Sequence, residues 1–326
     1  MKISTKAWVA YIKKMSQISE TAADLMQKWV QKNGFGNDKA LLDYAFALSQ
    51  HYGQAIGALS CQMYEATAAA QGAVIPTAEM AELPEYGEVA KAIHGTMKQS
   101  QNNVPATIAR LIKQVGADTT LKNAGRDGAE FAWVPHGDTC AFCITLASRG
   151  WQRMSKQALK KGHAEHIHAH CDCEYAVRFD GKSSVAGYDP EKYERIYYNM
   201  PGKNSQDKIN SLRRLISGKN PLTLDQVEFI IELEGNPEIL GGRSPRQWKN
   251  YLEFLGFETK PLGAGSLRGI KFEDGGGYRI NYRGDGYLQY HPEGRHHKVA
   301  YYKVSNARNG TKRFDTEGVE LDESKR

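Results

Sequence analysis

The cysteines and histidines of the chain are concentrated in one short window. Four of the five cysteines and five of the ten histidines lie between His136 and Cys173. Cys140 and Cys143 form a Cys-x-x-Cys pair, which presents two thiolates from one tight turn, and a second cysteine pair with flanking histidines follows. Proteins commonly supply tetrahedral Zn²⁺ sites in this way. The sequence therefore predicts a structural zinc ion.

The second group offers more donors than one tetrahedral zinc can take. A site of four cysteines and a site in which His168 replaces one thiolate both fit the sequence. A single residue separates Cys171 from Cys173, which makes ligation by both geometrically tighter than a two-residue spacing would. The candidate metal ligands are therefore Cys140, Cys143, His168, Cys171 and Cys173.

Other chemistry is open to the same residues. Two disulfides or a reduced, metal-free core with an exposed histidine loop are alternatives, but the N-terminus lacks the apolar run of a signal peptide, so we expect an intracellular, reducing origin. A catalytic thiol, with Cys140 or Cys143 as nucleophile and a histidine such as His136 or His168 as base, gains nothing from three neighbouring cysteines. A hydrolytic zinc would need an open position beside a general base, for which Glu165 and Asp172 are candidates.

The first third of the chain has the pattern of long helices. Apolar residues recur every three or four positions over 8–29 and again over 41–63, which predicts two helices packed as an antiparallel hairpin. A shorter helix is expected over 85–99, and Pro105 suits the first turn of a further helix. We expect residues 1–128 to form a helical arm or bundle. Cys61 is expected to be a buried packing residue within it and not a metal ligand.

Residues 129–218 have shorter elements. The stretches 131–134 and 175–179 alternate as strands do and enclose the cysteine window, and helices are expected over 189–199 and 205–217. This stretch is predicted to be a small zinc-stapled α/β module.

Two stretches of this module carry a resemblance to a known family. The first begins at Trp133 and reads W-V-P-H-G-D-T-C-A-F-C-I-T-L-A-S-R-G, and the second, H-I-H-A-H-C-D-C, ends at Cys173. Together they resemble the minor capsid proteins of tailed bacteriophages, in the MuF-like head-morphogenesis group and particularly its actinobacteriophage branch. The resemblance covers about residues 1–200. Where the broader family usually has a proline near the final histidine, this chain has Ala169, which leaves open whether His168 or His170 matches the family ligand.

The resemblance implies a structural virion protein. Such a protein is assembled in the host cytoplasm and lies inside the capsid near the portal, where the portal and major capsid proteins are its expected partners. The cysteine module would then be a folding staple whose zinc-binding free energy contributes to folding. No stretch of the sequence reaches the length of a membrane span, so no membrane partner is expected.

Residues 219–326 read as a separate α+β domain. Capping signals predict two helices, and the glycine-separated alternating runs that follow predict an antiparallel sheet. The Gly275–Gly277 run precedes a strand instead of a helix and is therefore read as a turn, not as a phosphate loop. The expected helices are 223–234 and 244–255, and the expected strands are 268–272, 277–282, 286–290 and 299–304.

This C-terminal domain is basic and rich in tyrosine. Residues 257–313 hold eleven Lys or Arg against five Asp or Glu, a net charge of +6 that equals that of the whole chain. Basic side chains interleaved with tyrosines suit contact with a nucleic-acid backbone and its bases, so phage DNA or RNA is a candidate partner. The alternative is an ordinary sheet that docks onto capsid or portal neighbours.

A sharper alternative is enzymatic. His291 with His296 or His297 could act as general acid and base, with Lys303 or Arg295 stabilising the transition state of a metal-independent ribonuclease. The general sequence pattern of the domain resembles that of the toxin-like domains appended to some phage head proteins, but no diagnostic motif matches. The chain would then be a virion-borne effector, and the sequence leaves open whether it is an enzyme.

Overall fold

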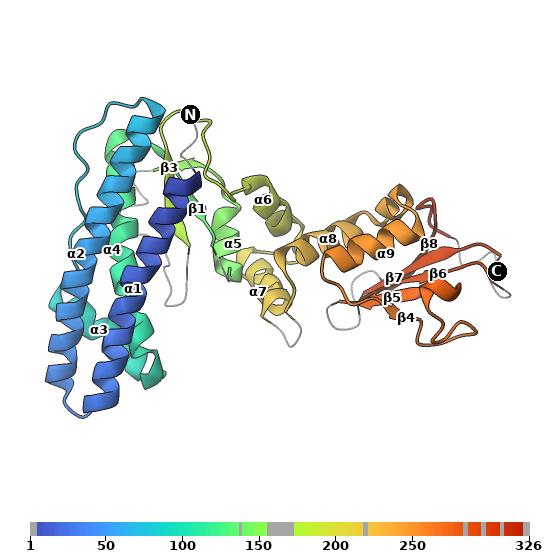
Figure 1. Cartoon of the computed structure of the whole chain (residues 1–326), viewed down its shortest axis with the longest axis horizontal. Helices are drawn as coiled ribbons and strands as arrows, with labels where there is room; N and C mark the ends of the chain where they lie inside the picture. Colours follow the sequence, from blue (N-terminus) through green and yellow to red (C-terminus); the bar gives the residue numbers. More distant parts are fainter. Residues whose placement is uncertain are drawn as a thin grey trace. The chain divides into compact units, whose positions relative to one another are not determined.

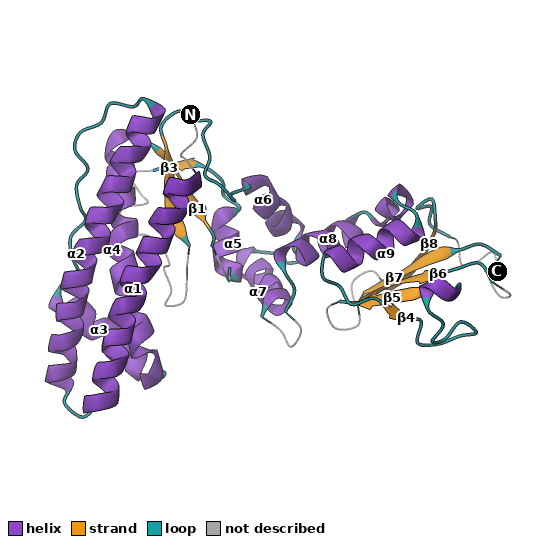
Figure 2. Cartoon of the chain, in the orientation of Figure 1, coloured by secondary structure: helices purple, strands orange, loops and turns teal. Residues whose placement is uncertain are grey.

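A computed structural model shows a chain of mixed α and β structure (Figures 1 and 2). The predicted α+β class is confirmed, with long N-terminal helices and a C-terminal antiparallel sheet of five strands. The chain divides into two compact units, Met1–Glu194 and Arg195–Arg326. The predicted division into three domains, at residues 128 and 218, stays a prediction. The structure describes residues 5–136, 139–154, 173–217, 221–282, 286–294, 298–306 and 310–321.

The N-terminal unit is built on three long helices that contact one another along their length (Figure 1). The predicted helical hairpin is confirmed: Asn37 caps the second helix by accepting from the backbone N–H of Ala40 at 3.1 Å, and Gly72 ends it in the left-handed conformation. Glu85 forms a capping box at the start of the short third helix. The helices are α1 (Thr5–Asn33), α2 (Asp38–Gln71), α3 (Tyr86–Met97) and α4 (Val104–Asp127), with a 3₁₀ turn, η1, at Gln101–Asn103.

Helix α4 packs against both helices of the α1–α2 hairpin and completes its core. Trp8, Met15 and Ile56 are almost wholly buried. A Cβ atom at Gly116 of α4 would lie 2.7 Å from side-chain atoms of both Ile56 and Met15, so the glycine is what allows the three helices to approach this closely. Cys61 of α2 was expected to be buried but is only partly buried; that partial burial raises the pKa of its thiol.

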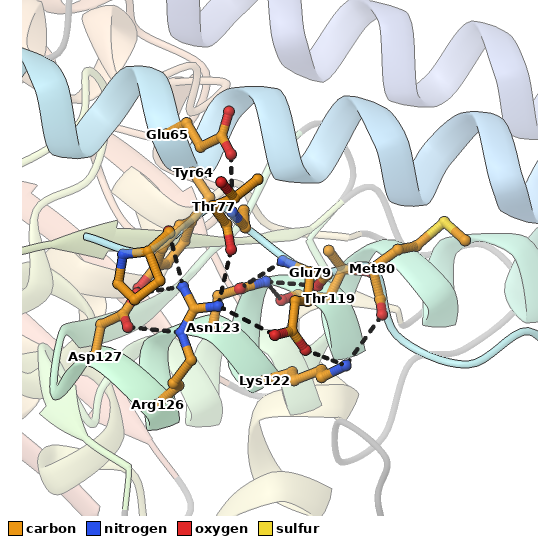
Figure 3. A network of polar contacts seen from close by, with 12 residues as sticks. Tyr64, Glu65, Thr77, Glu79, Met80, Thr119, Lys122, Asn123, Arg126 and Asp127 are labelled. Carbon is orange, nitrogen blue, oxygen red and sulfur yellow. Dashed lines mark hydrogen bonds and ion pairs between the residues drawn. The ribbon is translucent and has the colours of Figure 1, made fainter.

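An extended segment, 73–85, links α2 to α3 and is held along its length by side chains of α2 and α4 (Figure 3). Asn123 accepts from the backbone N–H of Glu79 at 2.9 Å and donates to its carbonyl oxygen at 2.8 Å. Met80 of this segment lies over Gly57, where a Cβ atom would come within 2.4 Å of it. The segment has no helix or sheet of its own, so these side chains replace the missing backbone partners. Bonds of the same kind join Glu65 to Ala78 N, Thr119 to Ala81 N, Arg126 to Pro76 O and Thr77 O, and Lys122 to Met80 O.

A small antiparallel sheet completes the N-terminal unit. Its strand order is β2-β1-β3, and Trp133 of the central strand lies opposite Tyr175. The two strands predicted on either side of the cysteine window are thus confirmed, and the structure shows that they pair with each other. Short helix α5 follows β1 along the chain and contacts it. The elements are β1 (Glu130–Val134), α5 (Ala141–Ala147), β2 (Gln152–Arg153) and β3 (Glu174–Arg178).

The C-terminal unit packs helices against one face of its sheet (Figure 2). The predicted helices are confirmed, and Ser244 and Thr223 both form the capping boxes expected of them. The helices are α6 (Pro190–Asn199), whose first residues belong to the N-terminal unit, α7 (Ser205–Ile216), α8 (Leu224–Gly235) and α9 (Pro245–Phe254), with a 3₁₀ segment, η2, at Pro237–Gly242. The sheet is β4 (Lys260–Pro261), β5 (Tyr278–Asn281), β6 (Tyr287–His291), β7 (Tyr301–Asn306) and β8 (Gly310–Asp315), in sequential order.

Alternate residues of these strands form the core of the unit. Ile280, Leu288 and Val304 lie in one cross-strand row and pack with Trp248 of α9 and Phe229 of α8. The opposite positions of the same strands therefore form the other face of the sheet.

The sequence placed three of the five strands correctly and one wrongly. Residues 268–272 are not a strand: Gly269 takes a left-handed φ of 74°, which interrupts the extended run, and a 3₁₀ turn, η3, follows at Phe272–Asp274. β4 and β8 were not predicted. The triple glycine does lead into β5, and a Cβ atom at Gly277 would lie 2.2 Å from the carbonyl oxygen of Tyr290 on the neighbouring strand. Among the described helices, none combines the length and apolar character needed to span a membrane.

Candidate functional site

The Cys-x-x-Cys pair lies at the start of α5. Cys140 is the N-cap residue, and its Sγ accepts from the backbone N–H of Cys143 at 3.4 Å. The two Sγ atoms are 3.4 Å apart, which is too long for a disulfide bond of about 2.05 Å. Two thiolates bound to one tetrahedral zinc at about 2.3 Å would lie about 3.8 Å apart. The observed separation is closer to that of two zinc ligands than to that of a disulfide.

Cys173 lies at the start of the third strand of the small sheet. It is buried immediately before β3, whose first residue, Glu174, pairs with Val134 at the end of β1. Strand pairing thus places Cys173 beside the end of β1 from which the chain continues to Cys140. Burial raises the pKa of the Tyr193 hydroxyl, and the neighbouring Cys173 adds a smaller effect in the same direction.

The remaining predicted ligands, His168 and Cys171, lie outside the described residues, as do Glu165 and Asp172. Within the described ranges, no three His, Cys, Asp or Glu side chains lie close enough together to hold a metal ion. The thiol pair fits zinc as two donors, and the full ligand set stays a prediction. His136, a candidate base, has its ring 5.9 Å from that of Trp8 in α1.

The second candidate site is the face of the C-terminal sheet opposite the helices. Strand pairing places Arg279 opposite Gln289, Gln289 opposite Lys303, and Lys303 opposite Arg313. Lys260 of the edge strand pairs with Arg279 and extends the same row. Four cations and one amide thus form one cross-strand row over the five strands, hereafter called the basic row.

Tyr287 stands beside the basic row, two residues from Gln289 along β6. The Arg279 guanidinium carbon lies 5.6 Å from its ring centroid and the Lys303 Nζ lies 5.5 Å from it, which is within the range of cation–π attraction. Burial acts to raise the pKa of the Tyr287 hydroxyl, but hydrogen bonds with Lys303, Ser305 and Thr311 outweigh it and lower that pKa below its ordinary value.

The predicted catalytic residues share this face only in part. His291 and Lys303 lie on neighbouring strands of it, diagonally placed in the register. The His291 ring stacks on that of Tyr301 with a centroid distance of 4.7 Å and an angle of 2°, and its Nε2 lies 3.0 Å from Oε1 of Gln289. His296, His297 and Arg295 lie outside the described residues.

Sequence reasoning missed most of the basic row. Arg279, Gln289 and Arg313 were not named, although each lies at an alternating position of a strand. The alternation shows that they share a face with their neighbours in the same strand, but only the pairing register shows that they are opposite one another.

Comparison with known protein families identifies the N-terminal part of the chain. A family model described as VG15 protein matches residues 2–200. The chain belongs to the VG15 family. This makes it a bacteriophage protein, in agreement with the phage origin that the sequence resemblance had implied. Neither the curated proteins nor the solved structures give a match. The VG15 match contains α1 to α5 and the cysteine motif, whereas the C-terminal sheet lies outside it.

Proposed function

We propose that this VG15 protein is a minor capsid protein of the MuF-like head-morphogenesis group in a tailed phage. It would be an internal component near the portal, with the portal and major capsid proteins as partners. The observation that carries the proposal is the family match over residues 2–200, which contains both the helical bundle and the Cys-x-x-Cys knuckle on which the resemblance to minor capsid proteins rests.

A structural zinc would suit the small sheet of the N-terminal unit. β1 and β3 have five residues each and β2 has two, so the sheet itself buries little apolar surface. A metal held by Cys140, Cys143 and donors of the second group would tie the start of α5 to the start of β3. Because such a site does not exist in the unfolded chain, the binding free energy would contribute directly to folding.

Virion proteomics tests the capsid assignment. We expect the protein in purified particles at low copy number, protected from protease in intact heads and digested once the heads are opened. An amber mutation in its gene should reduce the yield of infectious particles, and a plasmid copy of the wild-type gene should restore it. Absence of the protein from particles that assemble normally would overturn the proposal.

Elemental analysis of the full chain tests the zinc. We expect about one zinc per chain, lost together with thermal stability in the double variant Cys140→Ser/Cys143→Ser. Cys61→Ser is the matched control because Cys61 is a half-buried thiol of α2, remote in sequence from the motif, and should retain the metal. A wild-type chain that is fully stable without bound metal would rule out a structural role for zinc.

The second candidate is a virion-borne effector with a ribonuclease-like C-terminal domain. The observation in its favour is that His291 and Lys303 share the face of the sheet that carries the basic row. The test is incubation of the full chain with labelled RNA, with His291→Ala and His296→Ala/His297→Ala as variants. Cleavage that these variants abolish without unfolding would support the effector, and an inert wild-type chain would exclude it under those conditions.

A further inference from the structure

The basic row is a regular feature of the C-terminal sheet. Neighbouring strands are about 4.8 Å apart, so a row that crosses five strands spans roughly 19 Å. Lys260 forms an ion pair with Glu258 at 2.8 Å, but both side chains are more than half exposed, so that pair holds the lysine weakly. Within the described part of the chain, Arg279 and Lys303 form no ion pair at all. The centre of the row therefore keeps its positive charge for a ligand.

Aromatic rings flank the row on both sides. Tyr287 lies two residues to one side of Gln289 along β6, and His291 lies two residues to the other side, stacked on Tyr301. Residues two apart in a strand are separated by about 6.8 Å and point to the same face. Tyr301 is buried beneath the His291 ring. The rings of Tyr287 and His291 thus stand close enough to the row for one extended ligand to contact cations and rings together.

We propose that this face binds single-stranded nucleic acid, with phosphates along the basic row and bases against Tyr287 and the His291 ring. Proteins that bind single strands combine a positive track for the backbone with aromatic side chains on which bases stack. An acidic peptide would use the cations but would have little use for the rings. A duplex would reach the phosphate contacts, but its bases are stacked on each other and hidden from the rings.

The site is specified by residues that the fold does not use for its own core. The core residues Ile280, Leu288 and Val304 are buried against α8 and α9, whereas Arg279, Gln289 and Lys303 of the row are partly exposed. Arg313 at the end of the row is partly exposed as a residue, but its Nε and Nη1 atoms are buried. The proposal concerns residues beyond the VG15 match and does not depend on the capsid assignment. The two can therefore fail separately.

Fluorescence anisotropy with the full chain tests the proposal. The probes are labelled single-stranded RNA and single-stranded DNA of mixed sequence, a DNA duplex of equal length, and polyglutamate of matched charge. We expect either single strand to bind at least tenfold more tightly than the duplex or polyglutamate. The logarithm of affinity should fall with the logarithm of salt concentration with a slope of about −2, because Lys260, Arg279 and Lys303 would each release about 0.7 counterion.

Three variants separate charge from stacking. Arg279→Ala/Lys303→Ala should weaken single-strand binding at least tenfold and reduce the salt slope by about two thirds. Tyr287→Ala should weaken binding roughly tenfold without changing the salt slope, and Tyr287→Phe should restore most of it because the ring remains.

Lys312→Ala is the matched control. Lys312 is also a lysine of β8, but it shares the core-side register with Phe314, opposite Val304, and pairs with Glu320 at 2.9 Å. It should leave affinity within twofold of the wild type. Thermal unfolding of every variant establishes that the fold is intact. Equal binding of polyglutamate, or an equal loss with Lys312→Ala and with Arg279→Ala/Lys303→Ala, would overturn the proposal.

Discussion

The two units of this protein use their polar side chains in opposite ways. In the N-terminal unit, Asn123, Arg126 and Thr119 of α4 bond to the backbone of the extended segment 73–85 and hold it against the helices (Figure 3). In the C-terminal unit, the polar side chains of the sheet project from the face that α8 and α9 leave uncovered. The first arrangement stabilises the chain, and the second is available to bind something else.

The difference follows from the elements that each unit contains. Residues 73–85 have no regular hydrogen-bonding partner, so side chains must satisfy their backbone groups. The five strands of the C-terminal sheet satisfy one another, and Arg279, Gln289 and Lys303 are not needed for the ladder. A buried polar group is costly to leave unsatisfied, whereas a polar group on an open sheet face costs little. Substitutions of similar chemistry should therefore have very different effects in the two units.

The largest expected effect is in the core beneath the sheet. Trp248 is 1% exposed, donates from Nε1 to the carbonyl oxygen of Leu240 at 2.8 Å, and packs near Phe229. Trp248→Ala should lower the free energy of unfolding of the C-terminal unit by about 3–5 kcal/mol. Denaturant unfolding with hydrogen exchange of the sheet amides measures it. Phe254→Ala on the same helix, at a position 84% exposed, should change stability by less than about 0.5 kcal/mol.

The comparison itself is tested by a pair of amide deletions. Asn123→Ala removes a fully buried amide and both of its bonds to the backbone of Glu79, so it should cost about 2 kcal/mol and increase hydrogen exchange over 77–81. Gln289→Ala removes an amide from the open sheet face and should cost less than about 0.5 kcal/mol. Equal costs for the two variants would contradict the distinction drawn between the units.

A smaller effect should come from the close approach of the three long helices. An Ala methyl at Gly116 would lie 2.7 Å from Ile56 and Met15, so Gly116→Ala should lower stability by about 1–2 kcal/mol despite the better helix propensity of alanine. At Gly95 of α3, nothing lies within 4 Å of the added methyl, and Gly95→Ala should raise stability by about 0.5–1 kcal/mol. Thermal denaturation distinguishes the opposite signs.

The smallest expected effect is on acid stability. A hydrogen bond from Arg126, and then one from the Tyr64 hydroxyl, lower the pKa of Asp127 against the opposing effect of burial. Because the folded pKa is depressed, the stabilisation is present above the unfolded pKa of about 3.9 and is lost as the pH falls through the folded value. Asp127→Asn should lower stability at pH 7 by less than about 1 kcal/mol and reduce its loss below pH 4, measured by urea unfolding. An unchanged pH profile would show that Asp127 contributes nothing to it.

Local signals in the sequence predicted most of the helices and several strands. The capping boxes at Thr223 and Ser244 and the apolar spacing of the long helices act between residues close in the chain, so the sequence alone reveals them. Residues 268–272 show the limit of this reasoning. Their alternation suits a strand, but a strand also needs a partner, and the left-handed Gly269 instead turns the chain.

For the candidate sites, the sequence by itself determined the donor types: the Cys-x-x-Cys knuckle, the second group of cysteines and histidines, and the excess of positive charge among tyrosines. Tertiary structure decided which of these residues meet. Pairing of β1 with β3 places Cys173 beside the end of β1, from which the chain continues to Cys140. The register of β5 to β8 sets Arg279, Gln289, Lys303 and Arg313 in one row and places His291 against Tyr301. The physical reason is that register depends on contacts between residues distant in the chain, and a shift of one residue would move every side chain of a strand to the opposite face.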